Sequence, residues 1–100
     1  MSMELHTIKQ AQAMRSGINV IGMVTGLEDP KTLNLKSGGT LQKRDVTLTD
    51  DTGSIVLSLW AEDIQNVKNG SKIEIVNGYT NIFKGKTSLT KGKFGQLKVL

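Results

Sequence analysis

Residues 45–89 read DVTLTDDTGSIVLSLWAEDIQNVKNGSKIEIVNGYTNIFKGKTSL. This stretch predicts two hairpins, each made of two strands and a tight turn, with a short helical link between them. Apolar and polar residues alternate within each strand, which is typical of a sheet with one buried face. Three of the four aromatic residues of the chain lie here: Trp60, Tyr79 and Phe83. We therefore expect a β-rich domain whose surface chemistry depends on where these rings point.

The first hairpin places a tryptophan on the face opposite the core. Its second strand carries Ile55, Leu57 and Leu59 at one parity, and Ser58 and Trp60 at the other. Successive side chains of a strand point to opposite faces of the sheet. If the aliphatic face packs in the core, Trp60 stands on the outer face.

Residues 50–53, DDTG, form the turn of this hairpin. Short polar side chains close such turns, and glycine supplies a positive φ. Asp45, Asp50 and Asp51 also offer oxygen ligands for a divalent cation. Because turn formation already explains the two adjacent acids, we predict no metal site.

The second hairpin requires a slip of one residue. Ile75 and Ile82 both favour the interior, yet they have opposite parity. A β-bulge at Asn77-Gly78 resolves the conflict, because a bulge adds one residue to one strand of a pair. Three residues beyond the bulge then share the outer face: Tyr79, Asn81 and Phe83.

The segments before and between the two hairpins predict further strands, a loop or hairpin, and a short helical segment. Residues 18–27 predict a strand bent at its glycines, with Ile18, Val20, Gly22 and Val24 on one face. Residues 28–40 are a loop or the arms of a hairpin with its tip at 37–40. Residues 41–50 form a strand with Val46 and Leu48 inward. Residues 61–69 are consistent with one or two helical turns.

The C-terminal region completes the sheet. Residues 86–90 predict a strand with Leu89 inward, and residues 91–95 a flexible basic bend. Residues 96–100 close the barrel with Leu97 and Val99 inward. We expect residues 1–16 to be an extension that packs on the barrel, and residues 17–100 to be a single domain.

Five short strands with a helix between the third and the fourth describe a small closed Greek-key barrel. This all-β architecture is that of the oligonucleotide/oligosaccharide-binding (OB) fold, whose binding face lies on the second and third strands. A Tudor-like or SH3-like barrel is the alternative, but those barrels usually lack the helical insertion.

Three segments resemble a known family: GINVIGMV (17–24), DVTLTDDTGSIVLSLW (45–60) and GYTNIFKGKTSL (78–89). They are similar to the single-stranded-DNA-binding domains of archaeal replication protein A and to the simple one-barrel single-stranded-DNA-binding proteins of archaea and eukaryotes. The similarity covers residues 8–99. Its most specific part is D-x-T-G-x-(I/V)-x-(L/V)-x-(L/V)-W, followed later by an aromatic, three residues and F-K-G.

The resemblance implies that three aromatic side chains stack on bases: Trp60, Tyr79 and Phe83. Some relatives carry a further aromatic where this chain has Thr90. Phe94 is equally a candidate substitute for that ring and a candidate core residue. Relatives often link several barrels and add a zinc ribbon. This chain has neither, which is consistent with one module of a longer protein.

Composition favours a polyanionic partner. The 100 residues carry a net charge of +4, and residues 78–100 hold five lysines and no carboxylate. Such asymmetry is typical of a groove that follows phosphates. We expect phosphate contacts from Lys84, Lys86, Lys91 and Lys93, with Lys36, Lys43 and Arg44 on the opposite bank. The simpler interpretation of each lysine alone is that it protects a sheet edge and keeps the protein in solution.

Hydroxyl and amide groups on the same outer face are candidate contacts to bases or sugars: Ser58, Thr47 and Asn81. Such residues are also common on exposed strand surfaces.

Several function classes find no support. Cysteine is absent and His6 is the single histidine, so we expect neither a disulfide framework nor a thiolate metal site. We find no phosphate-binding loop and no nucleophile–base pair, and therefore predict no enzyme activity and no cofactor. No secretory h-region and no apolar run of about 18 residues is present. A cytoplasmic, nucleoid-associated location is the expectation.

Three functional hypotheses follow. In the first, the domain holds about 4–6 nucleotides of single-stranded DNA and protects unwound DNA in replication, repair and recombination, together with other replication or repair proteins or further OB domains. The second is an RNA-binding barrel of the kind that recognises tRNA anticodons. The third is a barrel that uses the Trp60 face as a subunit interface.

Overall fold

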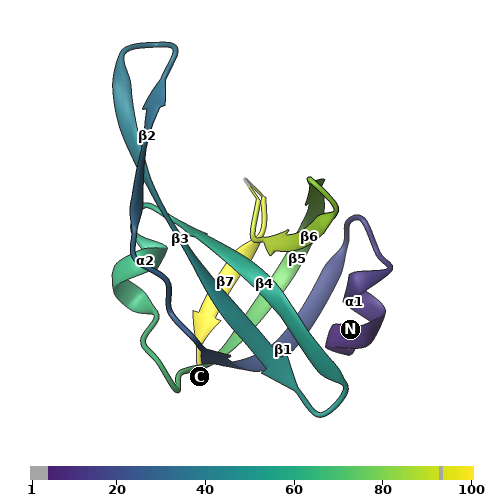
Figure 1. Ribbon diagram of the computed structural model, residues 1–100. Helices are drawn as coiled ribbons and strands as arrows, with labels where there is room; N and C mark the ends of the chain where they lie inside the picture. Colours follow the sequence, from purple (N-terminus) through teal and green to yellow (C-terminus); the bar gives the residue numbers. More distant parts are fainter. Residues whose placement is uncertain (1–4, 93) are drawn as a thin grey trace.

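The structure is a computed structural model that describes residues 5–92 and 94–100, with the side chain of Phe83 left undescribed. Two short helices and seven strands make up this part of the chain (Figure 1): α1 (Ile8–Gln12), β1 (Ile18–Thr25), β2 (Lys31–Leu35), β3 (Gly39–Asp50), β4 (Gly53–Trp60), α2 (Asp63–Asn66), β5 (Lys72–Phe83), β6 (Lys86–Thr90) and β7 (Gln96–Val99). No helix among these residues is long and apolar enough to cross a bilayer.

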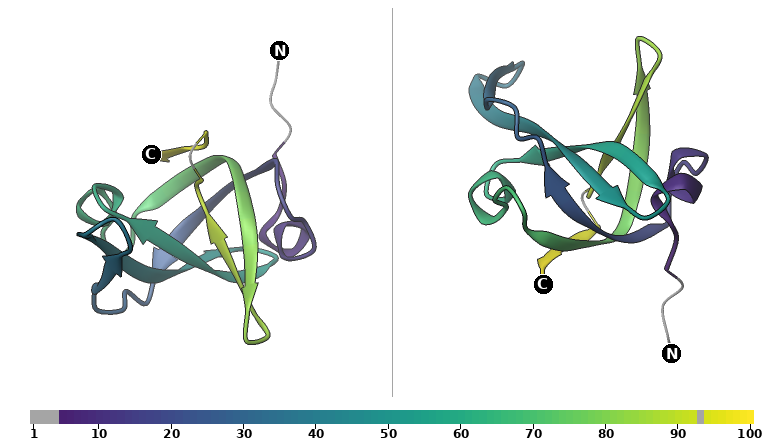
Figure 2. Two further views of the ribbon diagram at one scale, coloured as in Figure 1. Left: turned by 90° about the horizontal axis from the view of Figure 1, so that it is seen from above. Right: turned by 60° about the horizontal axis from the view of Figure 1, so that its bottom comes forward.

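Five of the strands close into a barrel (Figure 1, Figure 2). Neighbouring strands follow the order β1, β3, β4, β6 and β5, and β5 pairs back onto β1. The β4–β6 pair is parallel, and the other pairs of the ring are antiparallel. The predicted five-stranded Greek-key barrel, with a helix between its third and fourth strands, is confirmed.

The strands β2 and β7 lie outside this ring. β2 pairs with the first part of β3, so residues 31–43 form a hairpin that projects from the barrel (Figure 1). The hairpin interpretation of this region is therefore correct. The only pairing of β7 within the described residues is with β5. The prediction that residues 96–100 close the barrel is wrong, because the β1–β5 pair closes it.

Most of the core consists of the inward sets predicted from alternation, joined by Ile8, Ala11, Ile64 and Val67 from the two helical segments. Eleven side chains of the predicted inward sets are buried: Ile18, Val20, Val24, Val46, Leu48, Ile55, Leu57, Leu59, Ile73, Ile75 and Leu89. Two others are not, since Ile82 is 69% exposed and Val99 50% exposed. Ile82 lies on the β5–β6 hairpin where it extends past the barrel wall (Figure 2). Val99 lies at the end of an edge strand, where little covers it.

The predicted bulge in β5 is confirmed. Ile18 of β1 faces Gly78, whereas Val20 faces Ile75, so β5 contains one extra residue between these pairs. Asn77 adopts a left-handed φ of 56°, a conformation that asparagine tolerates better than most residues. The bulge buries Gly78 and turns Tyr79 to the outer face.

The helix α1 covers one end of the barrel and is held there by the β3–β4 turn. Thr7 caps α1 with a capping box, and Ile8 and Ala11 are fully buried in the core cluster. The amide of Ile8 donates to Asp50 Oδ2 at 2.9 Å, and the amide of Lys9 donates to Thr52 Oγ1 at 3.0 Å. The turn thus satisfies two amides at the start of α1 that have no partner within the helix.

Asp50 also closes its own turn. Its Oδ1 accepts hydrogen bonds from the amide and hydroxyl of Thr52 and from the amide of Gly53. Partial burial raises the pKa of Asp50, but the hydrogen bonds from Thr52, Ile8 and Gly53 outweigh this effect. The net result is a pKa below the ordinary value of 3.8. The assignment of Asp50 to a turn is confirmed, but the positive φ expected at Gly53 is wrong, because the hydrogen bonds to Asp50 close the turn without it.

Replacing Asp50 with asparagine is expected to lower the free energy of unfolding at pH 7 by about 1 kcal/mol, since three amides lose a charged acceptor. Because the pKa is lowered on folding, the carboxylate stabilises the fold above its unfolded pKa. This contribution is lost as the pH falls through the folded pKa. Urea unfolding of wild type and Asp50→Asn between pH 7 and pH 2 measures the difference. Asp51→Asn, in the same turn, is the control, and an equal loss at pH 7 and pH 2 would contradict the assignment.

Candidate nucleic-acid interface

Trp60 ends β4 on the outer face of the barrel, as predicted. Its indole Nε1 donates to Thr90 Oγ1 of β6 at 3.0 Å, and the ring is half-buried. Lys43, its partner across β3–β4, places Nζ 5.4 Å from the ring centroid, within the range of a cation–π contact. The ring is therefore held at its polar edge and remains partly open to solvent.

Tyr79 and Trp60 line one hollow, whose other lining residues are Leu41, Ala61, Glu62, Asp63, Thr90, Lys91 and Gly92. The tyrosine side chain is 38% exposed. Gly92 packs directly on its ring, since a Cβ at this position would lie 2.7 Å from Tyr79 Cε1. Two aromatic rings from different strands thus border the same concave surface, which we name the aromatic hollow.

Phe94 lines a second hollow, which shares Tyr79 and Gly92 with the first. Its side chain is 84% exposed, so the interpretation of Phe94 as a core residue is wrong. Phe83 ends β5, and its backbone pairs with Lys86. The side chain of Phe83 lies outside the described residues, so its place in a stacking surface remains a prediction.

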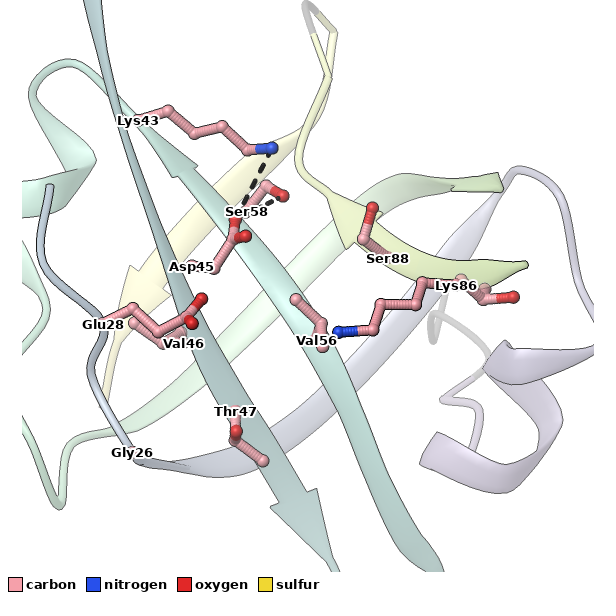
Figure 3. A pocket seen from close by; sticks show the side chains of 11 residues that line it. Gly26, Glu28, Lys43, Asp45, Val46, Thr47, Val56, Ser58, Lys86 and Ser88 are labelled. Atoms are coloured by element: carbon pink, nitrogen blue, oxygen red, sulfur yellow. Dashed lines mark hydrogen bonds and ion pairs between the residues drawn. The ribbon is translucent and has the colours of Figure 1, made fainter. Parts of the chain in front are cut away.

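A groove runs beside the aromatic hollow over β3, β4 and β6 (Figure 3). We call it the outer groove. It is lined by Gly26, Glu28, Lys43, Asp45, Val46, Thr47, Val56, Ser58, Lys86, Thr87 and Ser88. Lys43 reaches into it from β3 and Lys86 from β6, on opposite banks. Two of the predicted lysines, with Ser58 and Thr47, are thus brought together on one surface.

The remaining predicted cations lie elsewhere or are engaged. Lys91 forms an ion pair with Asp63 of α2, with Nζ 3.0 Å from Oδ2, and lines the aromatic hollow. Arg44 has the parity of the inward residues of β3, and its Nε donates to the carbonyl oxygen of Glu28 at 2.7 Å. The structure therefore does not bring Arg44 to the outer groove.

The other predicted residues sit at the edges of this surface. Lys84 is exposed in the β5–β6 turn, and Lys36 is exposed near the tip of the β2–β3 hairpin. Asn81 is exposed and pairs with Ser88, which lines the outer groove. Lys93 lies outside the described residues, so its phosphate contact stays a prediction.

The sequence pattern does not assign several charged and polar lining residues to the site, among them Glu28, Asp45, Glu62, Asp63 and Thr90. Asp45 has the parity of Thr47, opposite to the inward Val46 and Leu48, but its position in the groove depends on the parallel β4–β6 pair. Thr90 is 4% exposed because the indole of Trp60 covers it. No signal in the sequence predicts that hydrogen bond, since the two residues are thirty positions apart.

No group of three or more His, Cys, Asp or Glu residues within residues 5–92 and 94–100 could hold a metal ion.

Comparison with known proteins identifies the domain. Residues 5–93 match the family described as "Replication protein A OB domain". The chain belongs to this family. The resemblance inferred from the motifs is thereby confirmed, and so is the OB fold. An OB domain from Thermoplasma acidophilum superposes with a TM-score of 0.80 at 22% identity, covering 96% of this chain and 86% of that one.

Two curated relatives of this OB domain are archaeal. The single-stranded DNA binding protein Ssb of Saccharolobus solfataricus is 28% identical over 75% of this chain and 50% of its own length. Replication factor A of Methanothermobacter thermautotrophicus is 33% identical over 75% of this chain and 9% of its own length. The OB domain thus spans half or less of the length of these relatives.

Proposed function

We propose that this OB domain binds single-stranded DNA, with bases stacked on Trp60 and Tyr79 and with phosphates near Lys43 and Lys86. The observation that carries the proposal is the aromatic hollow, in which two partly exposed rings from β4 and β5 border one concave surface beside a lysine-lined groove. Stacking on each ring is worth on the order of 1–3 kcal/mol and tolerates any base, because every base has a π face.

The names of the relatives support this assignment. One is called a single-stranded DNA binding protein and the other a replication factor. We infer that the domain protects unwound DNA during replication, repair and recombination, and that it works beside further domains or partner proteins. Phe83 and Phe94 are candidates for additional stacking. We assign the domain a binding role and no catalysis.

Salt dependence tests the role of the lysines. If four to six phosphates are contacted, the logarithm of the binding constant for oligo-dT should fall with the logarithm of salt concentration with a slope of about −3 to −4. Lys86→Gln should make that slope shallower by about 0.7. The measurement is a fluorescence-anisotropy titration between 50 and 300 mM salt. Lys98→Gln is the control, since Lys98 lies on β7 and lines neither the groove nor the hollow.

Three results would contradict the proposal, two from this titration and one from size exclusion. Absence of oligo-dT binding at 50 mM salt, with no change in Trp60 fluorescence, would exclude a nucleic-acid site at this face. Stronger binding to RNA of the same sequence would favour an RNA-binding role, because a site that uses the 2′-hydroxyl prefers RNA. Concentration-dependent self-association on size exclusion that DNA does not reverse would favour a subunit interface.

A further inference from the structure

The outer groove contains a carboxylate where a site for a polyanion would be expected to hold only cations. Asp45 projects from β3 into the groove with its side chain 27% exposed (Figure 3). Its Oδ1 accepts a hydrogen bond from Ser58 Oγ at 3.0 Å and lies 3.7 Å from Lys43 Nζ. Oδ2 makes neither of these two contacts. The carboxylate is therefore oriented by its neighbours through Oδ1, within a side chain that lines the groove.

A second carboxylate lies on the same bank. Glu28 also lines the groove, and its amide donates to the carbonyl oxygen of Asp45 at 2.9 Å, which keeps the two residues adjacent. Two negative charges side by side repel a phosphate, whose approach would cost free energy. Lys43 Nζ is partly neutralised by Asp45, so the ammonium of Lys86 on the opposite bank is the groove's main attractive site for phosphate. A strand whose phosphate lies at Lys86 therefore presents a base edge, and not its backbone, to Asp45.

We propose that Asp45 is a specificity-determining residue that favours cytosine over thymine in the outer groove. This inference rests on the proposed function, since it assumes that single-stranded DNA occupies the groove. Cytosine carries an N4 amino group that donates to a carboxylate, and acidic side chains are its usual partners. Thymine carries O4 at the corresponding position, and this acceptor repels the carboxylate. Stacking does not distinguish the two pyrimidines strongly. The group that the base presents to Asp45, the N4 amino group of cytosine or O4 of thymine, therefore decides which base is favoured.

Ser58 is a positioning residue for this contact. Its side chain is buried, with 5% exposed, and its hydroxyl donates its hydrogen bond to Asp45 Oδ1. Removing the hydroxyl frees the carboxylate to rotate toward Lys43. The discrimination should then weaken without a change in the charge of the groove.

The test compares oligo-dC and oligo-dT of about eight nucleotides, a length within the range of one OB domain, at pH 8 and fixed salt by fluorescence anisotropy. The wild type is expected to bind oligo-dC at least about fivefold more tightly, the lower end of the discrimination given by a hydrogen-bonded base contact. Asp45→Asn is expected to bring the ratio close to one, because an amide can donate to thymine O4. Ser58→Ala should give an intermediate ratio.

Asp51→Asn is the control for the loss of one negative charge, since it removes a carboxylate from the exposed β3–β4 turn and not from the groove. It should leave the ratio of the two affinities unchanged, and circular dichroism confirms that each variant is folded. Equal binding of the two oligonucleotides by the wild type, or an unchanged ratio in Asp45→Asn, would overturn this inference alone. Failure of both oligonucleotides to bind would instead overturn the proposed function.

Discussion

Replacing Trp60 with alanine is expected to weaken binding of oligo-dT by about 5- to 100-fold. The indole offers the largest stacking surface in the aromatic hollow, and loss of one base–aromatic stack costs on the order of 1–3 kcal/mol. Lys43 lies over this ring, so the variant also loses the surface on which that ammonium rests. Anisotropy titration of labelled oligo-dT at constant salt measures the effect.

Two further variants separate stacking from stability. Trp60→Phe keeps an aromatic ring but loses the Nε1–H that donates to Thr90, so it should retain most of the affinity. Ile82→Ala removes an exposed apolar side chain from the face of β5 opposite Tyr79 and should leave binding unchanged. Thermal melts of all variants report any loss of stability. If a folded Trp60→Ala protein binds oligo-dT with unchanged affinity, the stacking model is wrong.

Replacing Gly78 with alanine is expected to lower the free energy of unfolding by about 1–3 kcal/mol, the usual cost of inserting an atom into a packed core. A Cβ at this position would lie 2.8 Å from Ile75 Cγ2, 3.1 Å from the carbonyl oxygen of Thr90 and 3.2 Å from Leu89 Cδ1. The carbonyl belongs to the backbone of β6 and cannot rotate away. Urea unfolding monitored by circular dichroism measures the change.

Gly39→Ala is the matched control, because its Cβ would meet only Leu35 Cδ1, at an ordinary 3.9 Å. Gly78 also follows the bulge that turns Tyr79 outward. Gly78→Ala is therefore expected to weaken oligo-dT binding as well, whereas Gly39→Ala is not. If Gly78→Ala is as stable as the wild type, the close packing of β5 on β6 at this position is wrong.

Local patterns predicted most of the barrel because they depend on near neighbours in the chain. Alternation identifies Leu57 as inward and Trp60 as outward whatever the strand pairs with. The Asp50 turn follows from short-range hydrogen bonds. The bulge follows from the opposite parity of Ile75 and Ile82, although Ile82 itself is exposed. Alternation also places Arg44 and Lys43 on opposite faces of β3, so the prediction that both lie on one bank of the groove is wrong.

The errors at Ile82 and Val99 have a different origin. Both follow the parity of an inward set, but burial also requires a neighbour on the other side. Ile82 lies beyond the barrel wall and Val99 on an edge strand, so each remains exposed. Alternation along a strand determines which face of the sheet a side chain lies on. Whether that face is buried depends on whether other parts of the barrel pack against it.

By itself, the sequence determined the strands, their turns, the inward aliphatic set and the outward position of Trp60 and Tyr79, since these depend on backbone alternation and turn chemistry over a few residues. Only the tertiary structure decided which outer-face residues share a surface. The parallel pairing of β4 with β6 brings Thr90 under the indole and Lys86 across from Lys43. It also encloses Asp45 in the groove between them. These contacts join residues far apart in the chain, and the closure of the barrel creates them.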